Sequence, residues 1–202
     1  MIKIIDQETS IQNPDELKSL VRSIFKPDGL LQKTLDFEHR AEQEEMAISV
    51  LDSIESNQHL IFEAGTGVGK SLAYLIPSVL FSKNRKRPCI VATNTINLQE
   101  QILNKDIPTL RTLFEKNHSL LSFADFSCAL LVGRGNYLCT TRLRKAALGQ
   151  GELFESRQKK ELERILEWAD GEAVEGIRQE LSPPPLQSVW DAVNADSSLC
   201  SG

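Results

Sequence analysis

Apolar residues in the first 60 positions of the chain recur three and four places apart, which is the spacing of one face of a helix. The stretch Asn-Pro-Asp-Glu at 13–16 is typical of a helix start, so we expect a helical lead-in over residues 1–36. A second helix is expected from about residue 38 to residue 56. Its apolar face would be formed by Ala41, Met46, Val50, Leu51 and Ile54.

Three short runs of consecutive apolar residues follow, at 60–62, 89–92 and 129–132. Continuous apolar runs of this length are typical of buried strands. Helices are expected between them, at 71–80 and 96–104, and Pro77 either ends or bends the first of these. Strands that alternate with helices predict an α/β fold, in which helices cover both faces of a parallel sheet. Ligands of such sheets bind at the carboxyl ends of the strands.

The pattern changes after residue 135. A charged amphipathic helix is expected at about 153–170, and the Ser-Pro-Pro-Pro stretch at 182–185 interrupts regular structure. We therefore divide the chain into a helical lead-in, an α/β domain and a separate helical segment, over residues 1–36, 37–135 and 136–202.

The composition is that of a globular protein which dissolves in water. Of the 202 residues, 41% are hydrophobic and 25% are charged, and no stretch approaches the roughly 18 uncharged apolar residues of a membrane helix. The amino terminus lacks the apolar core of a secretion signal, so we expect a cytoplasmic protein with no membrane partner. The net charge of −5 argues against binding nucleic acid through bulk positive charge, but it leaves room for a local groove.

Residues 63–71, Glu-Ala-Gly-Thr-Gly-Val-Gly-Lys-Ser, fit the phosphate-binding loop (P-loop) with one departure, Ala64 in place of the first glycine. The glycines let backbone N–H groups converge on an anion, and the following helix adds the positive end of its dipole. We expect Lys70 to reach the β- and γ-phosphates of ATP and Ser71 to hold Mg²⁺, so that both serve catalysis. The predicted nucleotide contacts of the loop are Ala64, Gly65, Thr66, Gly67, Val68, Gly69, Lys70 and Ser71.

Upstream of the loop, Arg40-Ala41-Glu42-Gln43 resembles the R-x-x-Q element with which superfamily 2 helicases read adenine. A glutamine amide offers both a donor and an acceptor to the adenine edge, so Gln43 and Arg40 are expected at the nucleotide. An ordinary solvent-facing helix explains the same residues equally well.

Residues 91–101, Val-Ala-Thr-Asn-Thr-Ile-Asn-Leu-Gln-Glu-Gln, resemble motif Ia of the DinG-type, XPD-like DNA helicases, with Asn94 where close relatives would carry histidine. Threonine, asparagine and glutamine side chains bind phosphates without net charge. The expected contacts with single-stranded or forked DNA are Thr93, Thr95, Asn97 and Gln101. Basic residues that could line the DNA path are Arg134, Arg142, Arg144 and Lys145, although a cluster of charges is usually a solvated face. A capped turn from a loop into a helix is the alternative for this stretch.

The stretch Gly-Arg-Gly-Asn-Tyr-Leu-Cys at 133–139 resembles the entry to the iron–sulfur insertion of the same family. The resemblance implies that Cys139 and Cys200 are the first two thiolate ligands of a [4Fe–4S] cluster in the complete protein. Residues 136–202 would then begin this insertion, and residues 37–135 would be the amino-terminal part of a RecA-like, ATP-binding domain. A pair of unrelated thiols is the alternative.

These resemblances together imply the amino-terminal portion of an ATP-dependent DNA helicase, which would move 5′ to 3′ on single-stranded DNA in repair or replication. No apolar run after Ser71 ends in the Asp-Glu pair that hydrolysis needs, so we expect a piece of a larger enzyme that hydrolyses ATP negligibly alone. Two other functions stay open: a non-catalytic nucleotide-binding module and, less favoured, a P-loop kinase of a small molecule. The long segment upstream of the loop argues against the kinase.

The sequence makes one direct prediction about binding. Replacement of Lys70 by alanine removes the cation expected at the phosphates, so it should greatly weaken binding of a nucleoside triphosphate while the fold stays intact. Calorimetric titration with ATP measures the first effect, and circular dichroism checks the second. Binding that is unchanged in the variant would remove the phosphate-loop interpretation.

Overall fold

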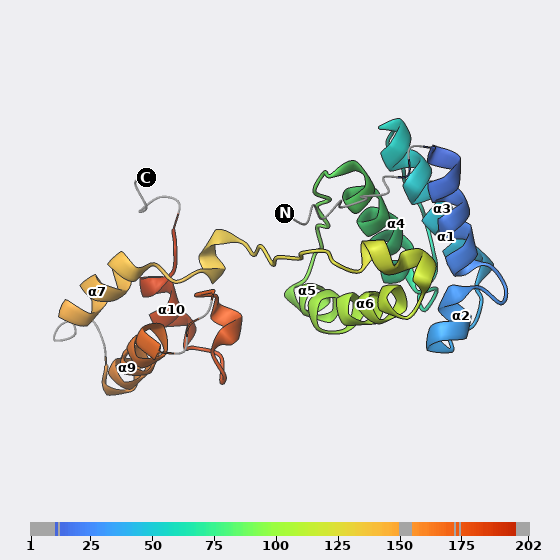
Figure 1. Ribbon diagram of the computed structural model, residues 1–202. Coiled ribbons are helices and arrows are strands. Elements are labelled where there is room, and N and C mark those ends of the chain that lie inside the picture. The colour runs from blue at the N-terminus through green and yellow to red at the C-terminus, as the bar shows by residue number, and fades with distance from the viewer. Residues whose placement is uncertain (1–10, 12, 150–154, 172, 174, 197–202) are drawn as a thin grey trace, which may run out of the picture. The chain divides into compact units, whose positions relative to one another are not determined.

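The computed structural model describes residues 11, 13–149, 155–171, 173 and 175–196, and the chain divides into two compact units, Met1–Ala129 and Leu130–Gly202 (Figure 1). Helices make up nearly all the regular structure of the described residues. None of these helices combines the length and the apolar character needed to cross a membrane.

The first unit is a stack of helices around α4 (Figure 1). Helix α3 packs along α4, and α1, the π-helical turn η1 and the 3₁₀ turn η2 also contact it. Their buried side chains form one hydrophobic core. The elements, in chain order, are α1 (Pro14–Phe25), α2 (Leu30–Leu35), α3 (Ala41–Ser56), α4 (Lys70–Arg85), α5 (Ile96–Gln101), η1 (Ile102–Asp106), α6 (Ile107–Glu115) and η2 (His118–Phe123).

Helix α1 confirms the helix start that the sequence predicts. The side chain of Asn13 accepts a hydrogen bond from the backbone N–H of Asp15, and a proline occupies the first turn, where its missing N–H costs nothing. The apolar face then buries Leu17, Val21 and Ile24 completely. An ion pair between Lys18 and Asp52, 2.5 Å apart, joins this helix to α3.

Helix α4 runs through Pro77 to Arg85, so the proline does not end it. Pro77 has no N–H, which leaves the carbonyl of Ala73 without its usual partner four residues on. Burial offsets this loss, because Ile76 and Leu80 on the same helix are fully buried against α1 and α3. An ion pair between Arg85 and Glu55, at 2.7 Å, fastens the end of α4 to α3.

The predicted α/β fold is wrong: no sheet occurs among the residues that the structure describes, and the RecA-like parallel sheet is not seen. The three apolar runs at 60–62, 89–92 and 129–132 are extended chain without ladder partners. Three of their side chains are 98%, 94% and 81% exposed, namely those of Ile61, Ile90 and Leu131. The apolar faces of the helices bury one another, so these runs form no sheet, although Phe62 packs against the core of the first unit. Runs this short cannot be assigned by pattern alone.

The second unit is a smaller helical assembly, which agrees with the helical character expected after residue 135. Its core surrounds Trp190, which is 1% exposed and donates its indole N–H to the carbonyl of Gly135 at 2.8 Å. Helix α9 confirms the predicted charged amphipathic helix, with Leu162 and Ile165 fully buried. The elements are η3 (Arg134–Asn136), α7 (Thr140–Leu148), α9 (Ser156–Gly171), η4 (Arg178–Glu180) and α10 (Gln187–Val193).

Two isoleucines provide a matched test of this fold. Ile76 is fully buried and Ile61 is 98% exposed, so Ile76→Ala should lower the free energy of unfolding by about 2–5 kcal/mol, and Ile61→Ala should change it by less than about 0.5 kcal/mol. Urea unfolding of both variants measures the difference. A large decrease in the free energy of unfolding of Ile61→Ala would contradict the exposed placement of Ile61.

Candidate nucleotide-binding site

The loop that joins residues 60–62 to α4 has the backbone conformation of an anion-binding nest. Gly67 and Gly69 have left-handed φ angles of +82° and +83°, which side chains with a Cβ rarely adopt. Left-handed residues that alternate with right-handed ones turn successive backbone N–H groups toward one side. Gly67 and Gly69 of the predicted phosphate loop therefore have the left-handed backbone conformation that favours glycine.

Helix α4 begins at Lys70, directly after the loop. Its first N–H groups have no partner within the helix, and its first turn carries no acidic residue, so this end keeps its positive potential. The ammonium group of Lys70 donates to the carbonyls of Ala64 and Gly65 at 3.0 and 2.7 Å. The ammonium group of Lys70 thus lies at the loop, where it can donate to phosphate oxygens in place of these carbonyls.

Helix α3 fixes the loop through the two residues that the sequence predicts at the adenine. The side chain of Gln43 is 5% exposed, and its amide donates to the carbonyl of Gly69 at 2.9 Å. The guanidinium group of Arg40 donates to the carbonyl of Gly67. A Cβ added to Gly69 would lie 2.2 Å from the nitrogen of this amide, so the Gln43 side chain would have to move, and the φ of +83° would also be strained. Both residues contact the loop backbone, and their contact with adenine stays a prediction.

Two further polar residues, which sequence reasoning missed, lie in the first unit. Tyr74, one helical turn beyond Ser71 along α4, is half-buried. Burial raises the pKa of the Tyr74 phenol, the Ser71 side chain lowers it, and the charge of Asp106 raises it. The net effect is a raised pKa, so the phenol keeps its proton at neutral pH. Asp106 is only 8% exposed and accepts a hydrogen bond from the Gln101 amide at 3.4 Å.

The predicted DNA-contact residues lie on a capped turn that leads into α5, which was the alternative interpretation of this stretch. Thr95 caps the helix by accepting from the N–H of Leu98 at 3.3 Å, and Thr93 donates to the Thr95 carbonyl at 3.2 Å. The side chains of Thr95, Asn97 and Gln101 are exposed, and Thr93 is half-buried. The capped turn therefore leaves polar groups at the surface, and the contact with DNA is untested.

Cys139 is half-buried at the position that caps α7, and its N–H donates to the carbonyl of Val193 at 2.8 Å. Next to it, Leu138 and Asn194 form an antiparallel bridge. Cys200 lies outside the described residues. Within the described part of the chain, no three His, Cys, Asp or Glu side chains group to hold a metal, and the ligand roles of Cys139 and Cys200 stay a prediction.

The side chain of Arg142 is engaged within the second unit, and its place beside DNA stays a prediction. Its guanidinium group donates to the carbonyl and the side-chain oxygen of Asn194, at 2.5 and 2.7 Å, and to the carbonyl of Asp191 at 2.6 Å. These carbonyls end α10, where a cation is favourable. Arg142 thus stabilises the second unit.

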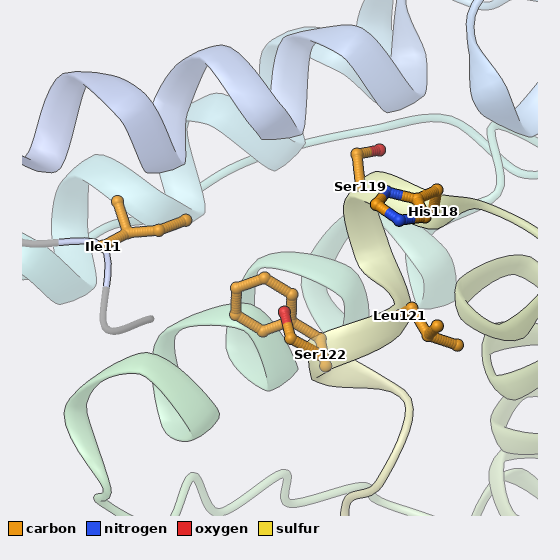
Figure 2. Close-up of a pocket in the computed structure, with 6 residues that line it drawn as sticks. Ile11, His118, Ser119, Leu121 and Ser122 are labelled. Carbon is orange, nitrogen blue, oxygen red and sulfur yellow. The ribbon is translucent and has the colours of Figure 1, made fainter. Parts of the chain in front are cut away.

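A surface hollow of the first unit lies beside η2, lined by Ile11 and by residues of that turn (Figure 2). Figure 2 shows His118 and Ser119 at one end of the turn and Leu121 and Ser122 further along it. None of the predicted site residues lines this hollow.

Comparison with known proteins agrees with the resemblance found in the sequence. Residues 43–122 match a family described as DEAD/DEAH box helicase. The chain is 34% identical over 175 residues to the ATP-dependent helicase DinG of Mycobacterium tuberculosis, across 81% of the chain and 26% of that relative. It is 39% identical over 130 residues to the ATP-dependent DNA helicase YoaA of Escherichia coli, across 64% of the chain and 19% of that relative. The chain spans about a quarter of the length of such relatives.

The bond between Gln43 and the loop leads to a prediction. Gln43→Glu replaces the amide donor to Gly69 with a negative charge at an anion site, so it should weaken ATP binding about tenfold to a hundredfold. Gln58→Glu makes the same charge change at an exposed position and should leave binding within about twofold. Calorimetric titration with ATP compares the two variants. Equal affinities of the Gln43→Glu and Gln58→Glu variants for ATP would show that the hydrogen bond from Gln43 to Gly69 does not shape the loop.

Proposed function

Because the chain is a homologue of part of the DinG- and YoaA-type ATP-dependent DNA helicases, we propose that it is the nucleotide-binding portion of such a helicase. The observation that carries this proposal is the glycine nest at Gly67 and Gly69, which lies at the start of α4 and inside the matched region. A match to a helicase family over this same region argues against a small-molecule kinase.

The loop residues would bind the phosphates of ATP through their backbone N–H groups. When ATP binds, Lys70 would leave the carbonyls of Ala64 and Gly65 and donate to the β- and γ-phosphate oxygens. Its hydrogen bonds to these charged oxygens are stronger than those to neutral carbonyls. The Ser71 hydroxyl would hold Mg²⁺, which neutralises phosphate charge when bound. Residues 64–71 thus supply the binding and charge stabilisation that phosphoryl transfer requires.

Gln43 and Arg40 would read the adenine while they hold the loop. One N–H of the Gln43 amide serves Gly69, and the second N–H and the carbonyl oxygen offer the donor and acceptor that adenine needs. The same residues at the start of α3 would then hold the phosphate loop and bind the base.

Single-stranded DNA would bind along α5 and the turn that precedes it. Thr93, Thr95, Asn97 and Gln101 offer neutral donors to phosphate oxygens, which suits a chain with a net charge of −5. Translocation from 5′ to 3′ in the cytoplasm, on single-stranded or forked DNA during repair or replication, completes this proposal for the whole helicase.

Cys139 and Cys200 would be the first two ligands of a [4Fe–4S] cluster in the complete protein. Support comes from the second unit, where Ala195 donates its N–H to the carbonyl of Tyr137 at 2.8 Å and Cys139 donates its N–H to the carbonyl of Val193 at 2.8 Å, so residues 193–195 run beside the segment that carries Cys139. The cluster would need two further thiolates, since four is the usual number.

A non-catalytic nucleotide-binding module is the second candidate. The absence of an Asp-Glu pair after an apolar run beyond Ser71 favours it for the chain alone. Under either proposal, ATP turnover by the purified chain should stay far below the roughly 1 s⁻¹ of a typical enzyme, and a rate at that level would contradict both.

The DNA-binding proposal is tested with fluorescent oligo(dT) in an anisotropy titration. The double variant Asn97→Ala with Gln101→Ala loses two neutral phosphate donors, so its affinity should fall about tenfold. Gln58→Ala, an exposed amide at the end of α3, should bind oligo(dT) like the unmodified chain. If the double variant and the control bind equally well, DNA does not contact Asn97 and Gln101 of α5.

A further inference from the structure

The start of α3 lacks the side-chain cap that usually stabilises the first turn of a helix. In a capping box, the side chains of the N-cap residue and of the third helical residue bond to backbone N–H groups at the helix start. In α3 these residues are Arg40 and Gln43, and both side chains bond elsewhere. They donate to the carbonyls of Gly67 and Gly69 in the predicted phosphate loop. The two positions that could cap the helix therefore hold the loop instead.

A polar contact spans the same helix start. His39 precedes the N-cap residue, and Glu44 is the fourth residue of the helix. Nε2 of His39 lies 3.1 Å from a carboxylate oxygen of Glu44, and because a carboxylate only accepts hydrogen bonds, the imidazole is the donor. Apolar residues at these two positions often pack as a hydrophobic staple, which fixes the angle at which the chain enters the helix. His39 and Glu44 connect the same two positions through polar groups.

We propose that His39 and Glu44 are positioning residues for nucleotide binding, which fix the helix turn that holds the phosphate loop. The inference rests on the proposed function, because it concerns how the chain would bind ATP. Within this turn, the backbone N–H groups of Gln43 and Glu44 donate to the carbonyl of Arg40 at 3.0 and 3.2 Å. The contact between His39 and Glu44 closes across these bonds, so it holds the backbone of both residues that reach the loop.

Partial burial makes this contact stronger than an ordinary surface ion pair. The side chains of His39 and Glu44 are 26% and 23% exposed, so less water competes for the bond. The core of the unit does not depend on the contact, because Ala47 and Leu51, further along α3, are almost fully buried. Loss of the contact should therefore loosen the first turn and release the loop, while the rest of the helix and the core stay folded.

The test is calorimetric titration of the chain with ATP and Mg²⁺. His39→Ala removes the donor, so binding should weaken about threefold to tenfold, the range expected for one hydrogen bond. Glu44→Ala removes the acceptor and should weaken binding to a similar degree. His39→Gln keeps an N–H donor at nearly the same distance from the backbone, so its affinity should stay within about twofold of the unmodified chain. Circular dichroism should show equal helix content in all three variants.

Glu45→Ala is the matched control, because Glu45 is exposed and adjoins Glu44 in the helix. It removes the same charge, so it should leave ATP binding within about twofold. A second comparison separates positioning from general stabilisation of the helix. In a chain that carries Arg40→Ala and Gln43→Ala, His39 has no loop contact to position. Adding His39→Ala to that chain should therefore change the affinity for ATP by less than about twofold.

Weaker ATP binding in His39→Ala, with no further loss in the triple variant, would support the positioning role. Unchanged affinity in His39→Ala, or an equal loss with and without the side chains of Arg40 and Gln43, would overturn the inference and leave the proposed function intact. An unmodified chain that does not bind ATP would instead overturn the proposed function, and the inference with it.

Discussion

The arrangement of the candidate site depends on one buried hydrogen bond, from the Gln43 amide to the carbonyl of Gly69. The bond joins the first turn of α3 to the residue that precedes α4, so the loop is held by the same two helices that form the core of the unit. The left-handed φ of Gly69 and the absence of a Cβ both serve this contact. With Arg40 on Gly67, two carbonyls of the loop are fixed and the N–H groups between them can point to an anion.

Packing of the helices supports this bond. The core side chains Ala47 and Leu51 of α3 and Ile76 and Leu80 of α4 are almost fully buried, so the two helices cannot shift without opening the core. The loop between them is therefore held in place by the two helices, although Gly65, Thr66 and Gly67 are exposed. A preorganised loop loses less conformational entropy when it binds a phosphate.

The sequence predicts the loop better than the fold. The glycines and the Lys-Ser pair at 65–71 are recognisable because the anion nest requires specific backbone angles, and the structure has these angles at Gly67 and Gly69. The sheet was predicted from apolar runs alone, and Ile61 in the run at 60–62 is 98% exposed, since nothing in a short pattern states which partner will bury it. Asp106 could not be found, because its burial follows from a π-helical turn that has no sequence pattern of its own.

The central claim is that the loop at 64–71 binds the phosphates of ATP through its backbone. Heteronuclear NMR of the ¹⁵N-labelled chain tests it directly, by following each amide resonance while ATP and Mg²⁺ are added. The account predicts that the largest shifts occur at Gly67, Gly69 and Lys70, while the amides of the second unit stay unchanged. Shifts that are absent from the loop, or spread evenly over the chain, would contradict it.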